Sequence, residues 1–218
     1  MGKKRPTVRR ITDSETREKA LDVMTVVYRD EKGWIPERED LLPVADLDDP
    51  EVAWFLCELD GQSLGVTRVL FRIPEELYEK YAFELVDPSI DVKAFLRNHK
   101  IAEVGRFAVV PEYRDKILVA ATLMRAATTE TVERGFTHFI TDVFEGDPTS
   151  PYHFHKEILG FETVATHEVG ELRHKGRRIT MLLDLAAAYK RMSKKRRWIF
   201  RYITEGWNER MIEQLSTI

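Results

Sequence analysis

The sequence predicts an α/β (α+β) fold in which helices cover both faces of one mixed central sheet. Three observations lead to this prediction: strands and helices alternate along the chain, one central run is almost continuously apolar, and the composition is that of a globular protein. The 218 residues are 43% hydrophobic and 33% charged, with 9 Pro and 11 Gly, which excludes a disordered or collagen-like chain. We therefore expect one domain over residues 1–185, followed by a basic helical tail over residues 186–218.

Each expected element follows from its local pattern. Asp13 or Ser14 can cap the first helix, and Gly135 can end the long central helix. The tripeptide Asp-Gly-Gln at 60–62 separates two β-rich runs and indicates a hairpin. In chain order we expect a strand over 7–11, a helix over 14–30, a loop with one short helix over 31–50, strands over 52–59 and 63–71, an insertion with one or two short helices over 74–98, a strand buried on both faces over 101–110, a helix over 116–134, a strand over 136–144, a helix within 151–159, and strands over 162–166 and 178–185.

Several classes of protein and site are excluded by composition. A single cysteine, Cys57, rules out a disulfide framework and a cysteine-rich metal site, and its apolar surroundings favour a small buried side chain. His153 and His155 share one segment, but only Glu157 lies near them as a carboxylate, so we expect no metal. No apolar run approaches the roughly 18 to 20 residues that span a bilayer, and we expect a cytoplasmic protein.

The tail carries a charge opposite to that of the body. From Leu185 onward there are eight Lys or Arg and three Glu, whereas the whole chain has a net charge of −3. Such a segment suits an acidic protein partner, peripheral contact with an anionic inner membrane, or a merely solvated helix face, and these alternatives stay open. Seven of its eight basic residues lie close together, namely Lys190, Arg191, Lys194, Lys195, Arg196, Arg197 and Arg201. Its apolar residues at helical spacing are Trp198, Ile199, Tyr202, Ile203, Met211, Ile212 and Leu215.

The element order, the segment EVGRFAVVPEYRDKILVAATLMRAATTETVERGF and the later HKEILGFE together resemble the GCN5-related N-acyltransferase (GNAT) fold. The resemblance covers most of residues 7–185 and implies acyl transfer to an amine without a permanently bound cofactor. In that superfamily a strand ending V-x-P-x-Y-R leads into a turn whose backbone N–H groups and helix N-terminus hold the pyrophosphate of coenzyme A. Val109, Pro111, Tyr113 and Arg114 match this motif.

The donor site departs from the family pattern where the turn is normally rich in small residues. Ile117 and Val119 stand at those positions, and Asp115 adds a negative charge. An acyl chain on acyl carrier protein arrives on a phosphopantetheine with one phosphodiester, so a weak pyrophosphate site costs that donor little. Acyl carrier proteins are acidic, which fits the basic tail. The resemblance therefore implies an acyl-carrier-protein or acyl-coenzyme A donor, held by Tyr113, Arg114, Lys116 and Ile117.

The N-terminal half has a narrower resemblance, to acyl-homoserine-lactone synthases and the related N-acyl amino acid synthases. The pieces that align are Tyr28 with Trp34, Asp46 and Asp48 in an acidic loop, Arg68, and the E-V-G-R-F run from Glu103 through Arg106 to Phe107. The chain departs from the lactone synthases at Met24, where they carry arginine, and at Gly105, where they carry serine. The C-terminal half is closer to the N-acyl amino acid synthases, and Trp34, Tyr28, Arg68 and Phe107 are the expected substrate-binding residues.

The chemistry of acyl transfer assigns candidate roles. An amine must lose a proton, an oxyanion must be stabilised, and the leaving thiol must regain a proton. Glu103 is the candidate base, although an ion pair between Glu103 and Arg106 would be an alternative role. The backbone N–H of Val109 is the candidate oxyanion donor, and Arg68 and Arg106 can orient Glu103 or bind an acceptor carboxylate.

The general acid is less clearly marked, because Lys156 stands where the family commonly has tyrosine. Tyr152 and His155 are the candidates. The leading hypothesis is an N-acyltransferase that moves a long-chain acyl group to the amine of an amino acid or similar small acceptor. The alternatives are an acetyl-coenzyme A dependent acetyltransferase, an acyl-homoserine-lactone synthase, and a catalytically silent module that binds acyl carrier protein or lipid.

Overall fold

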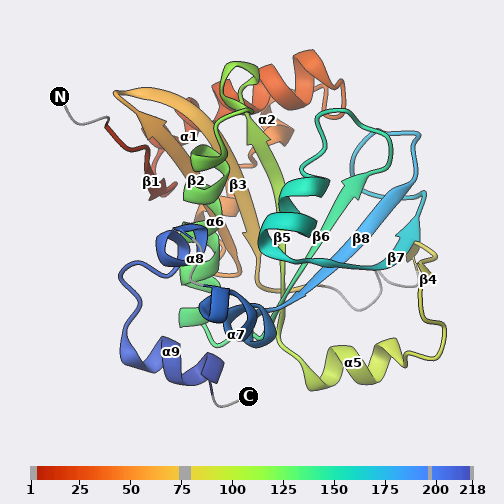
Figure 1. The fold of residues 1–218 in the computed structure, drawn as a ribbon. Coiled ribbons are helices and arrows are strands. Elements are labelled where there is room, and N and C mark those ends of the chain that lie inside the picture. The colour runs from red at the N-terminus through yellow and green to blue at the C-terminus, as the bar shows by residue number, and fades with distance from the viewer. Residues whose placement is uncertain (1–3, 74–79, 196–197, 217–218) are drawn as a thin grey trace. The chain divides into compact units, whose positions relative to one another are not determined.

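The computed structural model in Figure 1 describes residues 4–73, 80–195 and 198–216. The chain divides into two compact units, each made from two stretches of sequence. The first unit comprises Met1–Leu70 and Val104–Glu130, and the second comprises Phe71–Glu103 and Thr131–Ile218.

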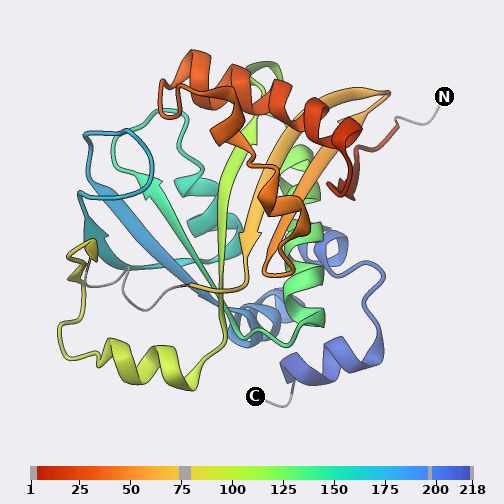
Figure 2. The same ribbon diagram turned by 180° about the vertical axis from the view of Figure 1, so that it is seen from behind.

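The first unit holds the N-terminal helices, the hairpin and the central helix. Its elements are β1 (Thr7–Arg10), α1 (Ser14–Met24), the π-helix η1 (Thr25–Glu31), α2 (Arg38–Leu41), α3 (Ala45–Asp48), β2 (Val52–Leu59), β3 (Gln62–Leu70), most of β5 (Ile101–Val109), the short 3₁₀-helix η2 (Pro111–Tyr113) and most of α6 (Ile117–Glu133). Helices α1 and α6 lie on opposite faces of β2 and β3, as the two opposite views show (Figures 1 and 2).

The second unit holds the remaining strands and the tail. Its elements are β4 (Glu84–Leu85), α5 (Val92–Asn98), the start of β5, β6 (His138–Phe144), the π-helix η3 (Phe154–Leu159), β7 (Glu162–His167), β8 (Arg178–Asp184), α7 (Leu185–Lys195), α8 (Trp198–Ile203) and α9 (Glu209–Ser216).

Among the described residues the strands form an eight-stranded sheet in the order β1-β2-β3-β5-β6-β8-β7-β4. Strands β5 and β6 pair in parallel, whereas the β2–β3 hairpin and the β6–β8 and β8–β7 pairs are antiparallel. Figure 1 shows β4 beside β7, where Glu84 pairs with Thr166. The sheet is therefore mixed, which confirms the predicted fold class.

The predicted helix over 14–30 changes its geometry part of the way along. Asp13 caps it, because its carboxylate accepts a hydrogen bond of 2.8 Å from the backbone N–H of Thr16, and this bond lowers the pKa of Asp13. Helix α1 ends at Met24, and the backbone continues as the wider η1 as far as Glu31. Such π-turns are frequent at functional sites, and apolar spacing does not distinguish them from α-helix.

Three other expectations need correction. The 31–50 segment holds two short helices, α2 and α3, instead of one. The 74–98 insertion contains α5 and the unforeseen edge strand β4, while residues 74–79 lie outside the described part. Strand β5 was expected to be buried on both faces, but its burial alternates, because Glu103 lies on a face that is only partly covered.

Strand β3 carries a glycine where its neighbours approach closely. A Cβ at Gly65 would lie 2.8 Å from the carbonyl oxygen of Ala108 and 3.0 Å from Cδ1 of Leu123 in α6. Val119 faces the same point at 3.4 Å and is 2% exposed. The absent side chain lets α6 and β5 approach β3 more closely than any other residue would allow.

Cys57 lies in β2 and is fully buried. Burial raises the pKa of its thiol to about 12, so the reactive thiolate is scarce near neutral pH. Cys57 thus behaves as a small apolar side chain, as its sequence context indicates.

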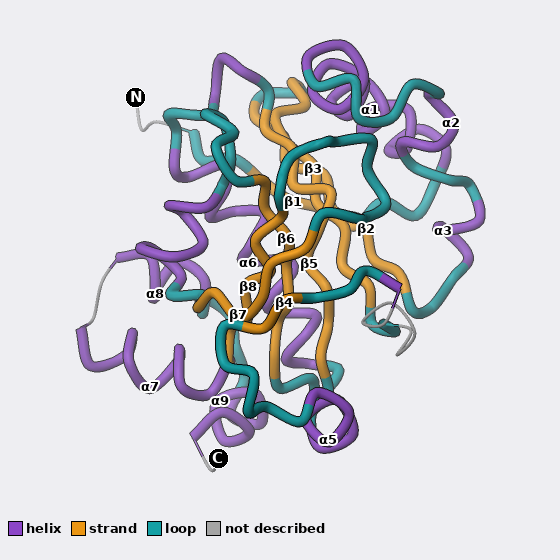
Figure 3. The backbone as a smooth tube through the Cα atoms, turned by 90° about the vertical axis from the view of Figure 1, so that its right-hand side faces the viewer, coloured by secondary structure: helices purple, strands orange, loops and turns teal. Residues whose placement is uncertain are grey.

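The tail forms helices that pack within the second unit. Helix α7 contacts both α8 and α9 (Figure 3), and Asp184 caps α7 by accepting a hydrogen bond from the backbone N–H of Ala187. Four of the apolar tail residues are buried: Ile199, Ile203, Met211 and Leu215. Trp198 and Ile212 remain 47% and 38% exposed. Arg196 and Arg197 lie outside the described residues, and no helix in the described part is long and apolar enough to cross a membrane.

We expect Gly65→Ala to lower the free energy of unfolding by about 1–3 kcal/mol. The added methyl group meets the backbone of Ala108, which cannot rotate away as a side chain can. Urea and thermal unfolding measure the change. Ser63→Ala, on the same strand, is the control and should change stability by less than about 0.5 kcal/mol. Identical unfolding midpoints for Gly65→Ala and wild type would contradict the close approach.

Candidate active site

The π-helix η1 brings together three of the residues that the sequence singled out. Tyr28 is 5% exposed, and its ring meets the ring of Trp34 edge-on, with centroids 5.2 Å apart. The backbone N–H of Trp34 also donates to the carbonyl of Tyr28 at 2.8 Å. The guanidinium of Arg106 lies 5.9 Å from the centre of the Tyr28 ring, within range of a cation–π contact.

Arg106 holds a strained backbone conformation. Its φ is +48° in the middle of β5, a value that residues with a side chain rarely adopt in a strand. Such strain is typical of functional sites. Val104, two residues before Arg106, and Ala108, two residues after it, are both buried. The surrounding packing therefore holds the bend in place.

The second buried arginine, Arg68, lies on β3 over an aromatic ring. Its guanidinium is 5.8 Å from the ring centre of Trp54, and Arg68 is 8% exposed. The indole N–H of Trp54 donates to the carboxylate of Asp46 at 2.8 Å. Asp46, from the acidic loop of the family resemblance, therefore positions the aromatic ring beneath Arg68.

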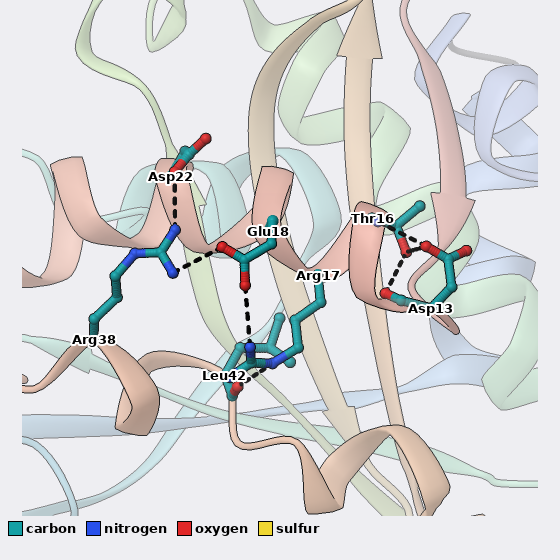
Figure 4. Close-up of polar contacts among 7 residues, drawn as sticks. All are labelled: Asp13, Thr16, Arg17, Glu18, Asp22, Arg38 and Leu42. Atoms are coloured by element: carbon teal, nitrogen blue, oxygen red, sulfur yellow. Dashed lines mark hydrogen bonds and ion pairs between the residues drawn. The ribbon is translucent and has the colours of Figure 1, made fainter.

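The loop that carries Trp34 is fastened to α1 by a polar network (Figure 4). Arg38 donates to Glu18 at 3.0 Å and to Asp22 at 3.1 Å, and Arg17 donates to the carbonyl of Leu42 at 2.9 Å. Individual surface pairs contribute little to stability. Together they fix both ends of α2 on α1, which limits the freedom of the Trp34 segment.

The β5–α6 turn uses its arginine within the protein. Arg114 donates from Nε to the carbonyl of Val109 at 3.0 Å and forms a bidentate ion pair with Glu31, at the end of η1. A planar guanidinium suits this two-point contact. Arg114, a predicted donor-binding residue, therefore connects η1 to the turn, and Glu31 is a partner that sequence reasoning missed.

The other predicted donor-binding residues lie around the start of α6. The hydroxyl of Tyr113 donates to the side chain of Gln62 at 3.2 Å, and Lys116 pairs with Asp115. Ile117, the first residue of α6, is 38% exposed. Val119 instead faces Gly65 in the core, so only Ile117 of the two replaced small residues lies at the surface of the turn.

Glu103 lies in the second unit at the end of a backbone ladder. Parallel pairing joins Ile101, Ala102 and Glu103 of β5 to His138, Phe139 and Ile140 of β6, and Glu103 opposite Ile140 is the last of these pairs. Its side chain is half-buried. A carboxylate in this position is a chemically suitable general base.

The two candidate acids have different surroundings. Lys156 donates from its ammonium group to the hydroxyl of Tyr152 at 2.9 Å, one helical turn away, and this hydrogen bond lowers the pKa of Tyr152. His155 is 1% exposed against Phe161, and burial lowers its pKa to about 4. A buried neutral imidazole is a poor proton donor, so Tyr152 is the better candidate.

The end of η3 is held by the tail. Arg191 of α7 donates to the carbonyls of Leu159 and Gly160 at 3.1 and 3.4 Å, which satisfies the last carbonyls of the helix. Gly160 has a φ of +87°, and a Cβ there would collide with the guanidinium. A shallow cavity of about 250 Å³ lies beside this contact and is lined by Lys156 as well as Arg191.

The comparisons with known proteins identify the fold. No protein-family model matches the chain, and no curated protein matches it. FeeM, an N-acyl amino acid synthase from uncultured soil microbes, aligns with a TM-score of 0.65 at 17% identity, over 88% of this chain and 97% of that chain. An N-acetyltransferase from Staphylococcus aureus Mu50 aligns with a TM-score of 0.57 at 14% identity, over 83% and 99%. The Escherichia coli ribosomal-protein-S18-alanine N-acetyltransferase aligns with a TM-score of 0.54 at 13% identity, over 82% and 93%. The chain therefore has the fold of the GNAT acyltransferases.

We expect Lys156→Met to raise the pKa of Tyr152, because the ammonium that stabilises its phenolate is removed. NMR titration of protein carrying ¹³C-labelled tyrosine rings measures this. Tyr152→Phe identifies the signal by deleting it, and Lys175→Met, a change elsewhere in the second unit, is the control. If the Tyr152 signal titrates at the same pH in Lys156→Met as in wild type, the proposed pairing is wrong.

Proposed function

We propose that the chain is an N-acyltransferase that moves a long-chain acyl group from a thioester to the amine of an amino acid or similar small acceptor. The observation that carries the proposal is the half-buried Glu103 at the last pair of the parallel β5–β6 ladder, in a chain with the acyltransferase fold. FeeM, which shares this fold, is an N-acyl amino acid synthase, and this supports an amino acid as the acceptor.

In the proposed reaction Glu103 takes a proton from the acceptor ammonium, and the free amine attacks the thioester carbonyl. The backbone N–H of Val109 donates to the oxyanion, the attacking nitrogen releases its second proton to solvent, and the intermediate collapses to the amide with loss of the thiolate. Tyr152 returns a proton to sulfur, while Lys156 stabilises the resulting phenolate. Tyr28, Trp34, Arg68 and Phe107 bind the acceptor and the acyl chain, and Arg106 packs against Tyr28.

Acyl carrier protein is the preferred donor in this proposal, and acyl-coenzyme A is the other thioester considered. Arg114 is occupied by Glu31 and Val109, and the first residue of α6 is an exposed isoleucine instead of a glycine. Both features weaken a pyrophosphate site. The exposed side chains of Lys190 and Lys194 on α7 supply positive charge for an acidic partner.

A second candidate is an acetyl-coenzyme A dependent acetyltransferase, because N-acetyltransferases are among the structures with this fold. An assay that compares thioester donors separates the two candidate functions. An acetyltransferase would use acetyl-coenzyme A more efficiently than any long-chain donor.

We expect Glu103→Gln to lower kcat by about 10² or more, the contribution of a positioned general base. The amide has nearly the same shape but cannot accept the proton. Steady-state release of free thiol in the presence of an amine acceptor measures the rate. Glu133→Gln, at the exposed end of α6, is the control. A folded Glu103→Gln protein with wild-type turnover would remove Glu103 from the mechanism.

We expect the double variant Lys190→Glu, Lys194→Glu to raise the KM for acyl carrier protein, with little change in kcat. The loss should shrink at high salt, since the Debye length falls from about 10 Å at 0.1 M to about 3 Å at 1 M. Matched assays with the same acyl group on coenzyme A provide the control, because that donor does not need the basic face. Arg191 is left intact because it caps η3. Unchanged kinetics with both donors would reject docking at α7, and binding to anionic vesicles that is lost in the variant would point to a membrane instead.

A further inference from the structure

A hydrogen-bonded cluster in the second unit holds a carboxylate that the mechanism does not use. Asp142, on β6, accepts from the hydroxyl of Thr180 at 2.7 Å, and its other oxygen lies 3.0 Å from Nε2 of His167. The ring is fixed from behind, because Nδ1 of His167 lies 2.6 Å from the carbonyl of Val169. The side chain of His167 is 0% exposed and that of Asp142 is 39% exposed.

The two hydrogen bonds of His167 fix the orientation of its ring. A carbonyl only accepts, so Nδ1 of His167 carries a proton and donates it to Val169. This bond turns Nε2 of the ring toward the carboxylate of Asp142. Tyr81, stacked on His167 with an interplanar angle of 7°, and Phe83, with its ring centre 4.4 Å from that of His167, hold the imidazole in place. Asp142 is therefore the solvent-exposed member of the pair.

Strand register places Asp142 on the same face as Glu103. Glu103 pairs with Ile140, and Asp142 is two residues further along β6, so all three side chains share one face. Neighbouring strands are separated by about 4.8 Å and residues rise about 3.3 Å each, so the two acidic positions are about 8 Å apart. The half-buried Ile140 lies between them. Two carboxylates separated by an apolar side chain match two amino groups joined by methylenes.

Three carboxylates act electrostatically on Tyr81 at this face. After burial, the charges of Glu171, Glu103 and Asp142 raise the pKa of Tyr81. Arg178 opposes them, and its guanidinium donates to the carbonyls of Glu168, Leu172 and His174. The negative charges of these three carboxylates favour a cationic ligand.

We infer that Asp142 is a specificity-determining residue that binds a second amino group of the acceptor while Glu103 receives the reacting one. This inference rests on the proposed acyl transfer. The substrate class is a diamine or a dibasic amino acid whose amino groups are separated by about four carbons, since carbon–carbon bonds of about 1.5 Å then span most of the distance. Ile140 contacts the methylenes.

The test compares matched acceptors with the acyl donor that the enzyme uses best. The pairs are 1,4-diaminobutane against n-butylamine, and ornithine against norvaline, which differ only in the second amino group. We expect wild-type kcat/KM to be at least about tenfold higher for the diamino member of one or both pairs, because hydrogen bonds between charged groups are the strong ones. The pair that shows the preference tells whether the acceptor also needs a carboxylate.

Variants connect the preference to Asp142. Asp142→Asn should bring the diamine-to-monoamine ratio of kcat/KM close to one, by raising KM for the diamino acceptor about 10- to 100-fold. Glu84→Gln, an exposed acid on β4, is the control and should keep the wild-type ratio. The Asp142→Asn change could disturb the packing of β6. The wild-type diamine-to-monoamine ratios of kcat/KM therefore test the inference independently of this variant.

Equal use of both members of each pair by wild type would overturn the inference and leave acyl transfer standing. A preference that survives Asp142→Asn would also overturn it, by moving the second amino group to another residue. Transfer to none of these amines or amino acids, with either donor, would overturn the inference together with the proposed function.

Discussion

The parallel pairing of β5 with β6 is the constraint that sets the position of the candidate base. Parallel neighbours must be joined by a crossover, and α6 is that crossover. The same strand gives its first three residues to the second unit and the rest to the first. Glu103 is the last residue of the ladder, and the backbone turns into a left-handed conformation at Arg106. The place of the candidate base is thus set by backbone hydrogen bonds, which few side-chain substitutions can shift.

Within the first unit, aromatic packing and an ion pair hold the short π-helix η1 in position. The wide turn η1 presents Tyr28 to Arg106, and Glu31 at its end holds Arg114. The family resemblance implies that Arg114 binds a phosphate of the donor. Here Arg114 instead joins Glu31, at the end of η1, to the carbonyl of Val109. The exposed side chain of Ile117 crowds the approach of a diphosphate, and the ion pair with Glu31 occupies Arg114, so both features weaken the same site.

Most of the fold could be predicted from the sequence, because the hairpin, the long helix and the apolar strands each have a local signature. The π-geometry of η1 and the edge strand β4 could not, since both depend on tertiary packing rather than on residue spacing. The candidate site divides in the same way. Glu103 and Tyr28 stand in recognisable motifs, whereas the contact of Asp142 with His167 joins residues 25 apart through the register of three strands. No local pattern encodes that register.

The contact between Arg191 and Gly160 has a consequence for how this chain can change length. A version that stopped at residue 185 would leave the carbonyls of Leu159 and Gly160 without the guanidinium that they now accept from. Conversely, a side chain at Gly160 would displace the guanidinium of Arg191 and would be strained at a φ of +87°. The tail and the Leu-Gly-Phe corner are therefore expected to be gained or lost together over evolutionary time, although they lie some 30 positions apart in sequence.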